Sequence, residues 1–293
     1  MKFFITKNNK WLMLFLIPSV LGYIVFSLIP MISTVFLSFT SWDIIGGAPE
    51  VIGFDNFVKI FTTKEFYQVM YNTFKYIILY IPLMIFSSMS VAMLFNNKIK
   101  VVGLFRVLLF IPVLTSWVAG AMIWRTALST QYGLVNNILN IFNITGPGWL
   151  TDPKWSMISI VIVSVWKDLG FFSLIIFGGL RGIDKSVIEA AKIDGANSLQ
   201  LFKRITFPLV TPTLFFVLIT AVINSFQLFP QVMVMTQGGP LGSTQVMVER
   251  IYNYGFRYYQ MGYAASLAVI LFVIILLITL IQMKLQRKWV YYE

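Results

Sequence analysis

The residues of this sequence that could do chemistry are few, and their types exclude several kinds of site. The chain has no cysteine and no histidine, the main ligands of zinc sites, and its carboxylates form no cluster. Residues 239–244 (GPLGST) are rich in glycine but lack the lysine with which a Walker A loop reaches the phosphates. No nucleophile stands beside a base within the apolar segments. We therefore expect no catalytic residue, metal or cofactor on this chain, so any ATP must be hydrolysed by another chain.

Two charged residues, Lys167 and Asp168, interrupt an apolar run at residues 155–180 that is long enough to cross a membrane. A charge at the middle of a membrane helix costs roughly 2.5 to 3.5 kcal/mol on insertion scales, so both side chains should face protein or a wet cavity. Adjacent helical residues point about 100° apart, so each should have its own partner. The pair is a candidate for a polar pathway, with structural pairing across the helix bundle or across a subunit interface as the alternative.

A second set of candidates lies at the end of a later apolar run, where Asn224, Ser225 and Gln227 accompany Phe226. Amide and hydroxyl groups supply the donors and acceptors that sugar hydroxyls need, and aromatic rings stack on the apolar faces of a sugar. These residues could line a sugar pathway. The alternative is hydrogen bonding between helices, worth about 0.6 to 2 kcal/mol a pair.

A polar island at residues 184–212 separates two of the apolar runs. Ser186 and Glu189 have the spacing of a capping box, which predicts the start of a short helix. Gly195 can adopt the left-handed conformation that ends a helix and changes the chain direction. Helices this short are marginal in water, so the element should be stable only when it packs against the membrane helices of its own chain or against a partner.

The island should continue with a second short helix at residues 199–206, capped by Asn197 or Ser198. Pro208 then fits the first turn of the next helix, because its missing N–H is not needed there. The sequence therefore predicts a helix, a turn and a helix between two membrane spans.

The island resembles the EAA loop of the permease subunits of binding-protein-dependent ABC importers. The matching residues are Glu189-Ala190-Ala191, Asp194-Gly195-Ala196, Ile205 and Pro208. Flanking segments resemble the MalF-like, carbohydrate-importing branch, and the resemblance covers nearly the whole chain. These segments are Ile52-Gly53-Phe54-Asp55-Asn56-Phe57, Asn72-Thr73, Leu180-Arg181-Gly182-Ile183, Thr236-Gln237-Gly238-Gly239-Pro240 and Met261-Gly262-Tyr263-Ala264-Ala265.

The resemblance implies an all-α membrane protein with the type I importer permease fold and a cytoplasmic EAA coupling helix. It implies a second homologous permease, two ATPase subunits that hold ATP and Mg, and an extracytoplasmic binding protein that delivers a carbohydrate, such as an oligosaccharide. The residues expected at the ATPase are Glu189, Ala190, Ala191, Asp194 and Gly195. The loop at Gly238, Gly239 and Pro240 is a candidate contact for the binding protein, with a tight turn as the alternative.

The composition agrees with a membrane protein, since 58% of the 293 residues are hydrophobic and 11% are charged, against roughly 25% charged in soluble domains. A net charge of +11 does not indicate a nucleic-acid-binding protein, because the lysines and arginines are scattered between apolar runs.

The predicted membrane spans are residues 11–39, 76–95, 107–124, 155–180, 209–229 and 264–283. We divide the chain into residues 1–70, with the first span and an outer loop, a core permease domain at 71–283 that includes the coupling loop 181–207, and a tail at 284–293.

The distribution of positive charge predicts the orientation. Fourteen lysines and arginines lie at the amino end (Lys2, Lys7 and Lys10), in residues 98–106 and 181–204, and at the carboxyl end, and seven lie in the segments of the opposite side. Cytoplasmic loops carry such an excess. We expect a multi-pass protein of the bacterial inner membrane with the island and both termini in the cytoplasm.

An ion-coupled secondary transporter or a channel is the rival reading. The sequence offers few intramembrane acids and no evident inverted repeat of broken spans. A self-sufficient transporter would also leave the polar island without a role. The sequence therefore favours an ATP-driven importer subunit that is not itself an enzyme.

Overall fold

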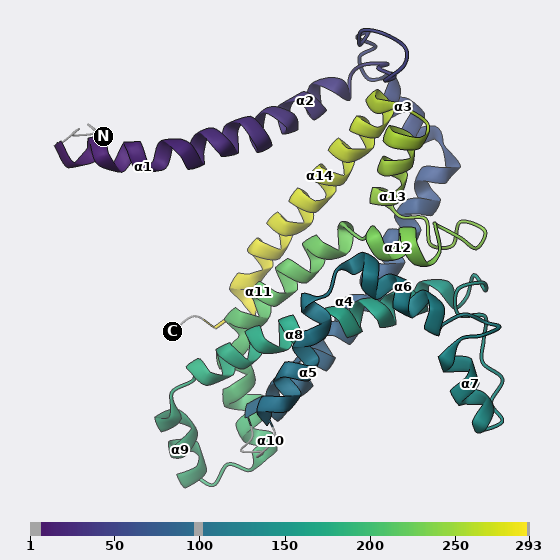
Figure 1. Ribbon diagram of the computed structural model, residues 1–293. Helices are drawn as coiled ribbons and strands as arrows, with labels where there is room; N and C mark the ends of the chain where they lie inside the picture. Colours follow the sequence, from purple (N-terminus) through teal and green to yellow (C-terminus); the bar gives the residue numbers. More distant parts are fainter. Residues whose placement is uncertain (1–6, 97–101, 292–293) are drawn as a thin grey trace. The chain divides into compact units, whose positions relative to one another are not determined.

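The computed structural model describes residues 7–96 and 102–291 (Figure 1). Over these residues the chain is helical, with no strand beyond the isolated bridges Thr40–Val51 and Asp43–Gln260, so the predicted all-α class is confirmed. The chain forms two compact units, Met1–Thr63 with Ile251–Phe272 and Lys64–Arg250 with Val273–Glu293. Lys2, Lys98 and Lys100, which contribute to the predicted charge asymmetry, lie outside the described residues.

The smaller unit begins with a continuous helical run made of α1 (Lys7–Tyr23), η1 (Ile24–Leu28) and α2 (Ile29–Leu37). The segment η1 is a π turn, in which the amide of Ile29 donates to the carbonyl of Ile24. A π turn holds one residue more than an α turn, and this one ends two residues before Pro30. Because a proline ring clashes with the carbonyl four residues earlier, the wider turn lets the helix continue through the proline.

The end of α2 is tied to two later elements of the same unit, α3 (Asp55–Thr62) and the start of α14 (Met261–Leu285). The side-chain amide of Asn56 donates to the carbonyls of Ser38 at 3.2 Å and Thr40 at 2.8 Å. The hydroxyl of Ser266 also donates to Ser38, at 2.7 Å. These buried bonds satisfy the carbonyl of Ser38, the C-cap residue that the helix end leaves without an intrahelical partner, and the carbonyl of Thr40 just beyond it.

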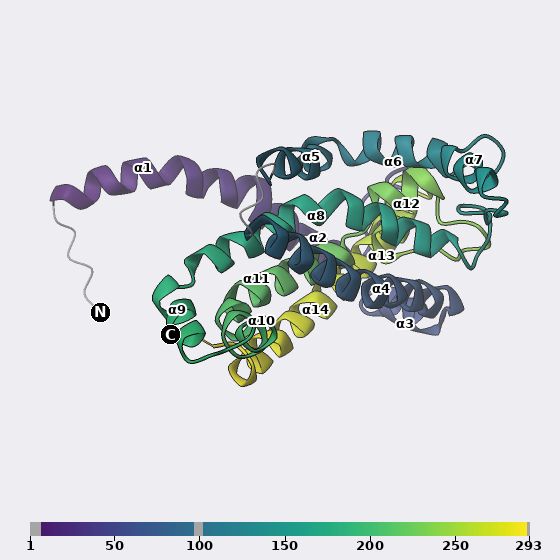
Figure 2. The ribbon, with the colours of Figure 1, turned by 90° about the horizontal axis from the view of Figure 1, so that it is seen from below.

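Three long helices form the core of the larger unit: α4 (Lys64–Asn96), α8 (Ser156–Gly182) and α11 (Phe207–Phe226) (Figures 1 and 2). The buried residues of α4 recur every three or four positions, which places them on one face of the helix. They pack with side chains of α8 and α11 in one cluster, which includes Tyr76, Tyr80, Met84, Met157, Ile160, Phe172, Ile176, Val210, Leu214 and Val217.

A fourth helix, α5 (Val102–Leu114), lies close against α8 at Gly170. A Cβ atom on Gly170 would collide with the backbone carbonyl of Leu109. The absence of a side chain at this position therefore permits the two helix backbones to approach each other, as small residues commonly do between membrane helices.

The described chain has five helices long and apolar enough to cross a membrane: Leu14–Leu37, Lys64–Asn96, Ser156–Gly182, Ser198–Phe226 and Met261–Lys288. A bent pair, Gly103–Leu114 and Trp117–Ala127, would make a sixth if it is counted as one span. The number of predicted spans agrees with this result. The prediction of one unbroken third helix at 107–124 is wrong.

The break in the third span has a local cause. The amide of Thr115 bonds back to Pro112 at 3.2 Å and ends α5, and Ser116 has an extended backbone with ψ 142°. The hydroxyl of Ser116 then accepts a bond from the amide of Val118 and caps α6 (Trp117–Ala127). This N-cap starts a new helix in a new direction, and the two helices are bent by 101°.

The fifth span also ends earlier than its predicted limit at residue 229. The helix α11 stops at Phe226, where the amide of Gln227 bonds to the carbonyl of Asn224 in a tighter turn. Pro230 then opens the short helix α12 (Pro230–Met235). A proline in the first turn suits a new helix better than the interior of an old one.

Candidate functional site

The polar island folds as α9 (Lys185–Ile193), a turn, and α10 (Ser198–Leu201). The predicted Ser186–Glu189 capping box is wrong, because Asp184 is the N-cap and its carboxylate accepts a bond from the amide of Ser186 at 2.9 Å. This bond also holds the pKa of the exposed Asp184 carboxyl below its ordinary value. A carboxylate at the N-terminus of a helix further interacts favourably with the helix dipole.

The prediction that Gly195 ends the first helix is confirmed. Gly195 has a φ of +81°, its amide bonds to the carbonyl of Lys192 at 3.1 Å, and the amide of Ala196 bonds to Ala191 at 3.0 Å. This pair of bonds is the Schellman motif, which requires a left-handed residue at the position of Gly195. The turn is therefore a defined structure and not a loose loop.

The second half of the island differs from its prediction. Asn197 caps α10 in a capping box with Gln200, but no separate helix ends before Pro208. The π turn η2 (Phe202–Thr206) joins α10 to α11, so Ser198–Phe226 is one helical run. The amide of Phe207 donates to Phe202, five residues back, and the wider turn accommodates the following Pro208. The turn after α9 is thus joined without interruption to a core membrane helix.

The exposed surface of this element carries several apolar side chains. Glu189 and Ala190 are exposed, whereas Ala191 is buried against the rest of the chain. Ile193 is 86% exposed and Leu199 is 61% exposed. Of the predicted coupling residues, Glu189, Ala190, Asp194 and Gly195 are therefore accessible, and Ala191 is not.

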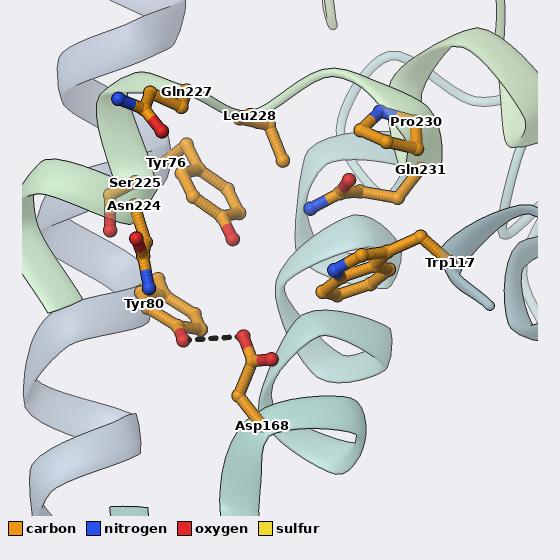
Figure 3. A pocket seen from close by; sticks show the side chains of 10 residues that line it. All are labelled: Tyr76, Tyr80, Trp117, Asp168, Asn224, Ser225, Gln227, Leu228, Pro230 and Gln231. Carbon is orange, nitrogen blue, oxygen red and sulfur yellow. Dashed lines mark hydrogen bonds between the residues drawn. The ribbon is translucent and has the colours of Figure 1, made fainter. Parts of the chain in front are cut away.

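A pocket of about 320 Å³ lies among the helices of the larger unit (Figure 3). It is lined mostly by aromatic and uncharged polar side chains from α4, α6, α8, α11 and α12. The lining residues are Tyr76, Tyr80, Trp117, Asp168, Asn224, Ser225, Gln227, Leu228, Pro230 and Gln231. The broken third span and the end of the fifth span both contribute, because Trp117 follows the break between α5 and α6, and residues 227–231 follow the end of α11.

The adjacent charges Lys167 and Asp168 point to different surroundings. A carboxylate oxygen of Asp168, which lines the pocket, accepts a bond from the hydroxyl of Tyr80 at 2.8 Å (Figure 3). The buried ammonium of Lys167 donates to the carbonyl of Val113 at 3.1 Å and lies 5.2 Å from the ring of Trp117. That carbonyl belongs to the last turn of α5, where carbonyls lack intrahelical partners. Lys167 thus binds α8 to the end of α5, where the third span is broken, and Asp168 faces the pocket.

Of the candidate residues at the end of the fifth span, three line the pocket and one does not. Asn224, Ser225 and Gln227 line the pocket, while Phe226 does not and instead packs edge-on against Phe74, with ring centroids 5.7 Å apart. Six further lining residues were not predicted: Tyr76, Tyr80, Trp117, Leu228, Pro230 and Gln231. The spacing of the two tyrosines, four residues apart on one face of a helix, was the one available signal, and it is also typical of a core.

The predicted binding-protein loop lies close to α4. Gly238 is buried, Gly239 and Pro240 are half-buried, and the neighbouring Leu241 is 90% exposed. The side-chain amide of Asn72 donates to the carbonyl of Gly242 at 2.8 Å.

An ion-pair network lies after the loop that contains Gly238, Gly239 and Pro240. The guanidinium of Arg250 donates to Glu65 at 2.8 Å and to the fully buried Glu249 at 2.9 Å. Because buried charges require such pairing, the network fixes the loop to the start of α4. The described residues contain no group of three or more metal-ligating side chains.

Comparison with known proteins agrees with this architecture. The probable ABC transporter permease protein YesP of Bacillus subtilis (strain 168) is 36% identical over 99% of this chain and 94% of its own length. The lactose transport system permease protein LacF of Rhizobium radiobacter is 33% identical over 96% of this chain and 94% of its own. A chain in the crystal structure of a bacterial alginate ABC transporter, with an alginate pentasaccharide-bound periplasmic protein, has the same fold, with a TM-score of 0.86 at 24% identity over 96% of each chain.

The family model described as "binding-protein-dependent transport system inner membrane component" matches residues 62–291. These residues hold the island, the pocket and all but the first of the membrane helices. The chain is therefore a multi-pass membrane protein and a transport subunit, and it belongs to the permease family of binding-protein-dependent ABC transporters.

Proposed function

We propose that this chain imports a carbohydrate, in particular an oligosaccharide, as one permease subunit of an ATP-driven importer. The observation that carries the proposal is the pocket, in which aromatic rings and uncharged polar groups meet between membrane helices. Sugars need both hydrogen-bonding groups and apolar faces for stacking. Relatives named as permeases for lactose, for arabinooligosaccharides and for trehalose and maltose support the same class of substrate.

In this proposal the energy of ATP hydrolysis reaches the permease through the turn after α9. In this proposal the exposed surface around Glu189 and Ile193 docks into a cleft of an ATPase subunit, and that subunit binds ATP and Mg. Because α9 follows α8 and the π turn joins α10 to α11, movement of the docked turn is transmitted to two helices that line the pocket. Closure of the ATPase pair would switch the pocket between outward and inward openings.

The assembly that this requires has a second homologous permease, two ATPase subunits and an extracytoplasmic binding protein. The exposed side chain of Leu241, beside the predicted contact residues Gly238, Gly239 and Pro240, offers an apolar contact to the binding protein. The excess of basic residues supports a cytoplasmic position of the island and of both termini in a bacterial cell.

Reconstitution in liposomes tests the proposal. The complete complex with its binding protein should accumulate a labelled oligosaccharide only when ATP is supplied on the side of the ATPase subunits. Uptake by this chain alone on a sodium or proton gradient would instead establish the ion-coupled alternative. The absence of ATP-dependent uptake of any saccharide by an intact complex would refute the proposal.

A further inference from the structure

The pocket contains one carboxylate among its described lining residues, and this carboxylate carries information about the substrate. Asp168 lies on α8, and Figure 3 shows one of its oxygens bonded to Tyr80 while the other points away from that tyrosine. The remaining lining groups are amides, hydroxyls, rings and apolar side chains. A bound molecule therefore meets a negative charge here without a cation beside it in the described lining.

The neighbouring Lys167 reduces the negative potential that Asp168 produces in the pocket, but does not remove it. The ammonium of Lys167 is directed to the carbonyl of Val113 and the ring of Trp117, and Lys167 does not line the pocket. Its charge offsets part of the field of Asp168 at long range. For a molecule inside the pocket the carboxylate dominates, because Asp168 lines the pocket, Lys167 does not, and the interaction energy falls with distance.

A second lining residue also offers an acceptor. Gln231 is only 5% exposed and its amide nitrogen donates to Ser164 at 3.4 Å, while its carbonyl oxygen has no hydrogen-bond partner among the described residues. A buried acceptor without a partner is unfavourable, so a ligand that supplies a donor gains from filling the site. Asp168 and Gln231 thus both favour donors.

We propose that Asp168, together with Gln231, makes this pocket selective for uncharged saccharides over saccharides that carry a carboxylate. The inference rests on the proposed function. A sugar hydroxyl can donate to either acceptor, whereas a carboxylate has only acceptors and also carries a like charge. The exclusion is a property of the permease itself and is additional to the selectivity of any binding protein.

The size of the effect follows from the charges. Two unit charges about 8 Å apart, at an effective dielectric constant of about 20, repel enough to weaken binding roughly thirtyfold. The partial offset by Lys167 lowers this value. We therefore expect the uncharged sugar to bind about tenfold more tightly than its carboxylate counterpart.

The test uses the intact transporter complex in lipid nanodiscs without its binding protein, so that only the permeases select. The probes are lactose, cellobiose and maltose, each paired with the disaccharide in which one CH₂OH group is oxidised to a carboxylate. Binding is measured as the tryptophan fluorescence change that disappears in the Trp117→Phe complex, because Trp117 lines the pocket. The quantity compared is the ratio of dissociation constants within a pair.

The wild-type complex should favour the uncharged member of a pair about tenfold, and Asp168→Asn, which keeps the shape of the side chain, should bring the ratio close to one. Gln231→Glu adds a second carboxylate and should increase the ratio. Asp152→Asn removes the same charge outside the described lining and should leave the ratio unchanged.

An unchanged ratio in Asp168→Asn would overturn the inference, and so would equal binding within every pair by the wild-type complex or no tryptophan signal with any probe. If ATP-driven saccharide uptake persists in those cases, the proposed function stands and only the selectivity is refuted. If that uptake is absent as well, the proposed function fails too.

Discussion

The turn at Gly195 offers the sharpest test of the proposed coupling to an ATPase. Gly195 has a φ of +81° and no heavy atom lies within 4 Å of the position that a Cβ would take, so Gly195→Ala changes backbone preference without a collision. An L-residue in the left-handed region costs about 1 to 2 kcal/mol. That cost corresponds to roughly a five- to thirtyfold smaller population of the Schellman turn relative to competing conformations.

The assay is ATP turnover of the reconstituted complex, stimulated by binding protein and sugar, measured together with uptake and with the yield of assembled complex. We expect stimulated turnover and uptake to fall at least fivefold in Gly195→Ala, and less in Gly195→Asn, because asparagine tolerates left-handed backbone better. Gly182→Ala is the matched control, since Gly182 also has open space around it but no positive φ. Wild-type coupling in Gly195→Ala, or an equal loss in Gly182→Ala, would refute the role of the turn.

Two further predictions concern the pocket and the loop. Asn224→Ala combined with Gln227→Ala should reduce uptake at least tenfold with normal complex yield, because two hydrogen-bonding groups leave the pocket lining. Arg250→Met should destabilise the complex by about 3 to 5 kcal/mol, measured as a lower melting temperature and yield, because it removes the guanidinium that pairs with the buried Glu249.

Each of these predictions has its own contradicting result. Unchanged uptake and sugar selectivity in the Asn224/Gln227 double variant would assign those side chains to helix packing. For the ion pair, Arg250→Met combined with Glu249→Gln should recover part of the lost stability. A double variant no more stable than Arg250→Met would exclude charge pairing as the cause.

The membrane helices could be predicted because a run of about 20 apolar residues has few alternatives to crossing a bilayer. Their ends could not, since single residues decide them. Ser116 is one hydroxyl in an apolar stretch, yet its capping bond starts a new helix and bends the third span. A window average of hydropathy does not register one cap.

The polar island was likewise predictable in part. Gly195 was predictable because few residues adopt its conformation readily. The cap of α9 was not, because Asp184 and Ser186 both suit an N-cap and the sequence does not say which residue has the extended backbone. The π turn before Pro208 was missed because a proline usually marks the start of a helix, and only packing shows that the helix continues.

The pocket could be predicted only in part. Asn224 and Gln227 were recognisable as polar groups in an apolar segment. Tyr80 and Trp117 were not, because aromatic residues in a membrane helix are as typical of packing as of a binding site, and the two come together only through the fold. Gln231 lies beyond the end of α11, in a short helix that the sequence did not predict.

The π turn at Phe202–Thr206 sets the angular register between the two ends of one helix. It holds one residue more than an α turn would, and one residue corresponds to about 100° of rotation. Deleting one residue there, with Pro208 replaced by alanine, would restore an ordinary helix and rotate the island by about 100° relative to Asn224 and Ser225. The direction in which the subunit presents the island, the surface that we propose docks to an ATPase, therefore depends on the number of residues in this turn and not only on their chemistry.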